Sequence, residues 1–356
     1  GVEGNNNSGS SSTVPSGRFV VFDSWADNLV SGDTNNALDV FLRDRQTGTT
    51  TRVSLTYAGG QANKSSYAGA VSDDGRYVAF QSEATNLVIG DTNARQDIFV
   101  RDTVAGTTER ISVSSTGTQG NNNSYRHVTM SADGNLVAFV SYASNLVAND
   151  TNGTSDVFIH NRTTKTTECF SVNPSGNPGN GQSECPSISE DGTHAVFASV
   201  AGDLVSGDTH NRWDIFLRNR GTGITTKISS NYSGGSLNNN CYNPDITPDL
   251  RYICYDSYAT TVVPNDTNLF RDVFIHDRTL NTTARVNVSA TGHQSERYSD
   301  CWTAGHSIGA GPKVTFYSEG SVLVPDDTNG MSDVFVKEIA TNTLTRLSSG
   351  PGNYEA

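Results

Sequence analysis

The chain has 356 residues, of which 34% are hydrophobic and 17% charged, and this composition is globular. Its formal net charge of −13 disfavours binding to nucleic acid or to an anionic membrane surface, because both require a basic footprint. No run approaches the roughly 18 consecutive apolar residues of a membrane span, so we also expect no membrane insertion.

One repeat accounts for the whole chain. Each copy holds the pattern Asp-Thr-(Asn/His)-x-x-x-Asp-(Val/Ile)-Phe, and the copies follow one another at intervals of 58, 59, 58, 58 and 61 residues. Around each pattern lie short runs typical of strands, which in the second copy are 70–71, 77–80, 98–100 and 110–111. We label the expected strands A to D. Each copy is therefore expected to form a four-stranded antiparallel sheet.

Six such sheets are expected to close radially, because a linear stack would bury little of each sheet. The sequence thus predicts an all-β, six-bladed β-propeller with about 58 residues per repeat. Aromatic residues recur at one position of strand B and one of strand C, and we expect them to form the packed layer between blades. We expect a single domain over 1–356, with repeats at about 1–54, 55–113, 114–172, 173–229, 230–288 and 289–349, and a tail at 350–356.

The segment Ser72-Asp73-Asp74-Gly75, followed by Arg76-Tyr77-Val78-Ala79-Phe80 and later by Asp97-Ile98-Phe99-Val100-Arg101-Asp102, resembles the repeat of TolB-type bacterial β-propellers. In that repeat a Ser-x-Asp-Gly turn joins strands A and B. The resemblance implies a bacterial propeller and leaves its function open, because such propellers serve as protein-binding scaffolds, binding modules and parts of hydrolases. The fifth copy has Asp249-Leu250 in place of the Asp-Gly step, so we expect an altered turn there.

The loops of the repeat differ in length, and the long ones are expected to carry function. The turns between strands A and B and between strands C and D are short. The B–C loop, at about 83–96 in the second copy, and the crossover to the next blade, at about 114–124, are long. Binding residues gather on long loops held by a rigid scaffold, so we assign function to the face with these loops.

The B–C loops form a ring of paired carboxylates. Oxygen ligands at positions one, three and seven resemble the beginning of a calcium loop, although the glutamate and glycine of an EF-hand are missing. The alternative is that Asp, Thr and Asn cap the loop through hydrogen bonds to its own backbone. His210 replaces the Asn in the fourth copy, where we expect the weakest metal binding. The candidate calcium ligands are Asp33, Asn35, Asp39, Asp91, Asn93, Asp97, Asp150, Asn152, Asp156, Asp266, Asn268, Asp272, Asp327, Asn329 and Asp333.

The copies differ most where strand A begins, a position that lines the central channel of a propeller. Aromatic, cationic and acidic side chains gathered there would suit a sugar or a peptide terminus, and ordinary surface variation is the alternative. The candidate ligand-binding residues are Tyr125, Arg126, His127, Tyr242, Asp245, Arg297, Tyr298, Asp300, Trp302 and His306.

We therefore expect a binding module for carbohydrate or protein, stabilised by calcium and acting as a monomer. The alternative is a carbohydrate-active enzyme with its site at the funnel. A polysaccharide lyase would use a His or Tyr base beside an Arg. A glycosidase would need two opposed carboxylates, for which Asp245 and Asp300 are the candidates.

The five cysteines are Cys169, Cys185, Cys241, Cys254 and Cys301. Their spacing matches no zinc motif, and one or two disulfides are expected if the protein is exported. We expect a secreted, periplasmic or cell-surface location.

Overall fold

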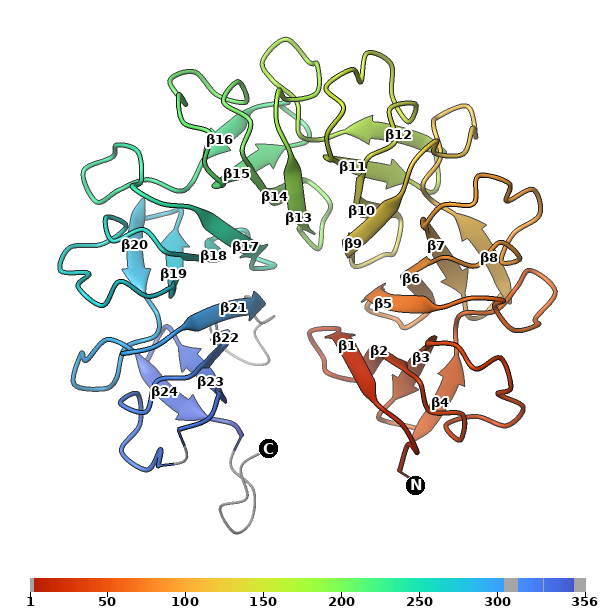
Figure 1. Ribbon diagram of the computed structural model, residues 1–356, viewed down its shortest axis with the longest axis horizontal. Helices are drawn as coiled ribbons and strands as arrows, with labels where there is room; N and C mark the ends of the chain where they lie inside the picture. The colour runs from red at the N-terminus through yellow and green to blue at the C-terminus, as the bar shows by residue number, and fades with distance from the viewer. Residues whose placement is uncertain (1–2, 304–312, 329, 349–356) are drawn as a thin grey trace. The chain divides into compact units, whose positions relative to one another are not determined.

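The computed structural model describes residues 3–303, 313–328 and 330–348. The chain is all-β and folds as a six-bladed β-propeller, with six four-stranded antiparallel sheets that each use consecutive strands (Figure 1). It divides into two compact units, Gly1–Thr193 and His194–Ala356. Among the described residues, no helix is long and apolar enough to cross a membrane. The fold class predicted from the repeat is confirmed.

The strands follow the predicted A-to-D order in every blade, and blade n is the nth sheet along the chain. Their bounds are β1 (Ser8–Thr13), β2 (Phe19–Ser24), β3 (Asp39–Asp44), β4 (Thr49–Arg52), β5 (Ser66–Val71), β6 (Tyr77–Ser82), β7 (Asp97–Asp102), β8 (Thr107–Arg110), β9 (Ser124–Met130), β10 (Leu136–Ser141), β11 (Asp156–Asn161), β12 (Thr166–Cys169), β13 (Ser183–Ile188), β14 (His194–Ser199), β15 (Asp214–Asn219), β16 (Thr225–Lys227), β17 (Cys241–Ile246), β18 (Tyr252–Ser257), β19 (Asp272–Asp277), β20 (Thr282–Arg285), β21 (Ser299–Thr303), β22 (Lys313–Ser318), β23 (Asp333–Glu338) and β24 (Thr343–Arg346).

The predicted aromatic layer is confirmed. In each blade the aromatic ring of strand B lies against the phenylalanine of strand C, as in the Phe80–Phe99 pair, whose ring centroids are 5.9 Å apart. All but Phe22 of these twelve rings are fully buried. The rings join valine, leucine and isoleucine side chains of the adjacent blade in the same core cluster. This burial is the main source of apolar stabilisation, at about 2 to 3 kcal/mol for each buried ring.

The A–B turns are held by a hydroxyl and a carboxylate. In blade 2 the Ser72 hydroxyl donates to the Asp74 carboxylate over 2.7 Å, and Gly75 closes the turn with a φ of +73°. The altered turn expected in blade 5 was a wrong prediction. Leu250 N donates to Thr247 O as Gly75 N does to Ser72 O, and Leu250 adopts a φ of +61°. A leucine therefore carries the left-handed backbone that glycine normally takes in this position.

The loop lengths agree with the prediction. In blade 2, residues 72–76 join β5 to β6 and residues 103–106 join β7 to β8, whereas residues 83–96 join β6 to β7 and residues 111–123 lead to β9. The long loops leave from the ends of strands B and D and return to strands C and A. Both the aspartate loops and the starts of the first strands therefore lie at the same end of each blade.

Candidate functional site

The paired loop aspartates face a cation that belongs to the chain itself. In blade 1 the guanidinium of Arg52, at the end of β4, lies 2.8 Å from Asp33 and 3.3 Å from Asp39. In blade 2 Arg110 lies 3.1 Å from Asp91 and 3.3 Å from Asp97. The arrangement recurs with Arg285 in blade 5, Arg346 in blade 6 and, with an ammonium, Lys227 in blade 4. In these five blades the buried carboxylates are thus neutralised by a cation of the same blade.

The second aspartate of each pair also accepts a hydrogen bond from a side chain 15 residues further along the chain. In blade 1 the Ser54 hydroxyl donates to Asp39 over 2.5 Å, and Asn35 donates its amide to the second oxygen of Asp39 over 2.8 Å. The Asn35 carbonyl accepts the backbone N–H of Ala37, which is the capping role weighed above. Burial raises the pKa of Asp33 despite Arg52, and it raises the pKa of Asp91 in the same way despite Arg110.

These loops do not fit calcium while the arginine stays in place. The guanidinium stands between the two carboxylates that would bind the ion, and Asn35 directs its N–H rather than its oxygen at Asp39. Asn93, Asn152 and Asn268 donate to Asp97, Asp156 and Asp272 in the same manner. Asn329 lies outside the described residues. Calcium binding by these residues stays a prediction.

Blades 3 and 4 depart from the common arrangement. In blade 3 Cys169 takes the place of the arginine, and burial raises the pKa of Asp150. In blade 4 Asp208, His210 and Asp214 each offer a ligand atom, and these atoms lie within 4.8 Å of one another. This is an acidic triad of the kind that holds a metal ion, at the copy where we expected the weakest site. Lys227, 2.7 Å from Asp214, competes for the same position.

A second cluster forms at the first strands of blades 5 and 6. Arg271, the residue before β19, donates from Nε to Asp256 of β18 over 2.5 Å, and its Nη2 lies 3.3 Å from Asp300 of β21. Asn243 of β17 donates to both carboxylates, over 3.1 and 2.9 Å. Asn243 sits at a β-bulge with a φ of +49°, and the bulge turns its side chain toward the two aspartates.

Tyrosines surround Arg271. Its guanidinium carbon lies 4.9 Å from the ring centroid of Tyr242, 5.5 Å from that of Tyr298 and 5.7 Å from that of Tyr258. The Tyr298 hydroxyl accepts from Arg271 and donates to Asp300 over 3.0 Å, and the Tyr317 hydroxyl also donates to Asp300. We call Tyr242, Asn243, Asp256, Tyr258, Arg271, Tyr298, Asp300 and Tyr317 the tyrosine–aspartate cluster.

The two aspartates of this cluster are perturbed in opposite directions. Burial and the hydrogen bond to Asp300 raise the pKa of Asp256 well above its usual range, since Asp256 is 0% exposed. Burial acts in the same sense on Asp300, but the hydrogen bond from Asp256 and the charge of Arg271 outweigh it and lower the pKa of Asp300. The guanidinium of Arg271 lies against both carboxyl groups.

The structure brings together Tyr242, Tyr298 and Asp300 of the predicted ligand-binding residues. Asp245 lies on the same strand as Tyr242, and Arg297 is exposed beside Tyr298. Tyr125, Arg126 and His127 belong to the first unit, where Tyr125 stacks on Tyr142 at 5.5 Å. His306 and the side chain of Trp302 lie outside the described part of the chain.

Sequence reasoning named Asn243 beside Tyr242 but missed Asp256, Arg271, Tyr258 and Tyr317. A signal was present, because Asp256 and Arg271 stand at repeat positions that vary between copies. The position of Arg271, just before the second aspartate, holds Leu38, Gln96, Ser155, Trp213 and Ser332 in the other copies. The comparison of copies was applied only to the start of strand A.

The expected disulfides are not formed by the cysteines whose side chains are described. Among these, Cys169 and Cys241 are free thiols. The register of the β17–β18 hairpin pairs Cys254 with Asp245 and Cys241 with Ser257.

Comparisons with known proteins support the fold. No family model and no curated protein matches this chain. Solved structures similar to it include the β-propeller domain of the Trilobed protease from Pyrococcus furiosus, with 11% identity, 98% of this chain and 85% of that one covered, and a TM-score of 0.58. An oligogalacturonate lyase from Vibrio parahaemolyticus is 12% identical over 94% of this chain and 75% of its own, with a TM-score of 0.54.

TolB from Acinetobacter baumannii is also among the similar structures, at 15% identity and a TM-score of 0.47. The match covers 88% of this chain, which spans 60% of the length of that protein. At such identities the likeness concerns the β-propeller fold alone.

Proposed function

We propose that this protein is a binding module for neutral carbohydrate, with its site at the tyrosine–aspartate cluster. The observation that carries the proposal is the set of three tyrosine rings around Arg271, next to amide, hydroxyl and carboxylate groups that converge from β17, β18 and β21. Aromatic faces pack against the C–H faces of a sugar, and the few convergent polar groups orient its hydroxyls. Tyr258 is 37% exposed and supplies an accessible ring.

The charge of the cluster favours a neutral ligand. Arg271 lies against both Asp256 and Asp300, so the cluster offers no spare positive charge for a substrate carboxylate. The chain as a whole carries a formal charge of −13, which repels an acidic polymer. A uronate-rich polysaccharide is therefore a poor fit.

The test is affinity electrophoresis of the intact protein through gels that contain neutral polysaccharides (glucans, mannan, xylan, galactan) or acidic ones (polygalacturonate, alginate). We expect at least one neutral polymer to retard the protein and the acidic ones to have no effect. Asp256→Asn should reduce the retardation. Asp23→Asn is the matched control, because Asp23 takes the same repeat position in blade 1 and is also buried. Retardation by the acidic polymers alone would contradict the proposal.

A second candidate function is a carbohydrate-active enzyme at the same cluster. The opposite pKa shifts of Asp256 and Asp300 favour it, because a neutral acid beside a carboxylate is what acid–base chemistry requires. The two groups are in hydrogen-bonding contact, whereas glycosidases separate their carboxylates by about 5 Å or more. A two-carboxylate glycosidase at Asp256 and Asp300 thus fits poorly. The pairing of Asp245 with Asp300 stays a prediction.

An assay of turnover separates the two functions. The polysaccharide that retards the protein is incubated with it, and new reducing ends and unsaturated products are measured. Binding without either product supports the binding module. Product formation that Asp300→Asn abolishes would establish the enzyme instead. A secreted, periplasmic or cell-surface location and a monomeric state stay predictions.

A further inference from the structure

In three blades a glutamine of the crossover folds back onto the aspartate loop. The Gln61 carbonyl accepts Thr34 N–H over 3.1 Å, and its amide donates to Gly32 O over 3.0 Å and to the Thr34 hydroxyl over 2.9 Å. Gln119 and Gln294 make the corresponding contacts to Thr92 and Thr267. Each of these blades therefore contains a binding site for a primary carboxamide, and its own glutamine occupies that site.

The arginine of the same blade completes this site. Arg52 Nη1 donates to the Gln61 carbonyl over 3.2 Å while it also contacts Asp33 and Asp39. The carboxamide oxygen thus accepts from a backbone N–H and from a cation, and the carboxamide N–H groups meet a carbonyl and a hydroxyl. Both halves of the amide are matched, which makes the environment selective for this group.

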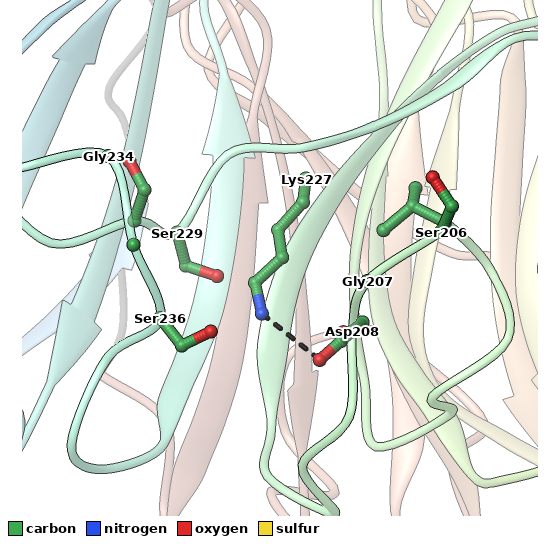
Figure 2. Close-up of a pocket in the computed structure, with 10 residues that line it drawn as sticks. Ser206, Gly207, Asp208, Lys227, Ser229, Gly234 and Ser236 are labelled. Atoms are coloured by element: carbon green, nitrogen blue, oxygen red, sulfur yellow. Dashed lines mark hydrogen bonds and ion pairs between the residues drawn. The ribbon is translucent and has the colours of Figure 1, made fainter.

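In blade 4 the residues that correspond to the glutamine and the arginine have shorter side chains. Ser236 stands at the position of Gln61 and Lys227 at that of Arg52. A cavity of about 330 Å³ lies there, and the groups that line it include Ser206, Gly207, Asp208, Lys227, Ser229 and Ser236. Figure 2 shows Lys227 between Ser229 and Ser236 on one side and Asp208 and Ser206 on the other, with its ammonium directed at Asp208.

The cavity keeps the groups that hold the glutamine in the other blades. Gly207 corresponds to Gly32, whose carbonyl accepts from the amide, and Lys227 offers a cationic donor in place of Arg52. The Asp208 side chain, 2% exposed, is held 3.3 Å from the Lys227 ammonium. This buried negative charge disfavours a ligand carboxylate at the same place.

We propose that this blade 4 cavity binds a primary carboxamide of a ligand, such as the side chain of glutamine, in the position that Gln61 takes in blade 1. The ligand is free glutamine or a glutamine side chain presented by a peptide. This site is separate from the tyrosine–aspartate cluster and does not depend on the proposed carbohydrate binding.

The test is isothermal titration of the full chain with L-glutamine, L-glutamate and a short peptide, Gly-Gln-Gly, at matched concentrations. We expect glutamine or the peptide to bind, and glutamate to bind at least about tenfold more weakly, because a site built for an amide rejects a group that leaves its donors and acceptors unpaired. If only the peptide binds, the ligand is a glutamine side chain presented by a peptide. If both bind, the site also accepts free glutamine. Equal binding of glutamate and glutamine would overturn the proposal.

Two variants test the location. Ser236→Gln should fill the cavity with the protein's own carboxamide and abolish binding, whereas Ser236→Ala leaves the cavity open and should preserve it. The double variant Gln61→Ser, Arg52→Lys copies blade 4 into blade 1 and should raise the stoichiometry from one to two. Binding that persists in Ser236→Gln, or no binding to the wild type at tens of millimolar, would refute the site. If the folded double variant still bound one ligand per chain, the shorter residues at these two positions would not be what creates the site.

Discussion

Replacing Arg110 by glutamine removes the guanidinium that lies 3.1 Å from Asp91 and 3.3 Å from Asp97. The Asp91 and Asp97 side chains are only 2% and 0% exposed, so water cannot take over the role of the arginine. Removing one partner of a buried ion pair costs about 3 to 5 kcal/mol, and we expect about 3 kcal/mol at pH 7. For a chain of this length that is a fall in Tm of roughly 4 °C.

The loss of stability caused by Arg110→Gln should depend on pH in a definite direction. Burial already raises the pKa of Asp91 with Arg110 present, and loss of the guanidinium raises that pKa further. A carboxyl group whose folded pKa lies above its unfolded value is most stabilising at low pH, and this stability is lost as pH rises through the folded pKa. The cost of Arg110→Gln should therefore be small at pH 4 and grow toward pH 7.

The assay is urea denaturation of the wild type and variants at pH 4 and pH 7. Arg110→Lys should lose only about 1 kcal/mol, because Lys227 contacts both aspartates of blade 4 in the same role. Asp91→Asn in the Arg110→Gln background should restore part of the loss. A cost below about 1 kcal/mol for Arg110→Gln at pH 7, or one that does not change with pH, would refute the reasoning.

The remaining predictions use the same loops and the buried thiols. Millimolar calcium should raise the Tm of metal-stripped protein by less than about 1 °C, because arginine occupies the carboxylate pairs; a larger shift that Asp91→Asn and Asp97→Asn remove would show that the loops bind calcium. Burial raises the pKa of Asp272 to about 6, so the free energy of unfolding should fall by roughly 3 kcal/mol between pH 4 and pH 7 through this group. Asp272→Asn should flatten that slope, and an unchanged pH profile would contradict the assignment. Burial raises the pKa of Cys241, so iodoacetamide should label it only after unfolding, and reduction should leave the protein's mass unchanged; rapid labelling of Cys241 in the native state would count against the buried thiol.

The sequence was sufficient for the blades because the aromatic positions of strands B and C recur in every copy. Phe80 and Phe99 are buried because adjacent blades pack against each other. The same packing requires an aromatic residue at these positions in every copy, and this recurrence can be read from the sequence. The carboxylate loops were recognised, with calcium binding and backbone capping as alternatives, but the cation that the chain itself supplies was not predicted. An arginine or lysine follows the second aspartate by 13 residues in five copies, as Arg52 follows Asp39, and this regularity was available in the sequence.

Only part of the tyrosine–aspartate cluster could be predicted from the sequence. Tyr298 and Asp300 stand out at the start of a strand, but Arg271 ends a loop and Asp256 lies near the end of β18, 44 residues before Asp300. Two blades and a β-bulge at Asn243 bring them together, and a bulge cannot be read from alternation of residue types.

The most direct measurement of the central claim is the affinity of the wild type and Tyr298→Phe for the neutral polysaccharide that retards the protein. The Tyr298 hydroxyl links Arg271 to Asp300, so its removal should weaken binding about tenfold, which corresponds to one lost hydrogen bond to charged groups. Tyr125→Phe, at the start of β9 in the other unit, should bind as the wild type does. Equal affinity of Tyr298→Phe and the wild type, or no neutral polysaccharide that binds, would contradict the account.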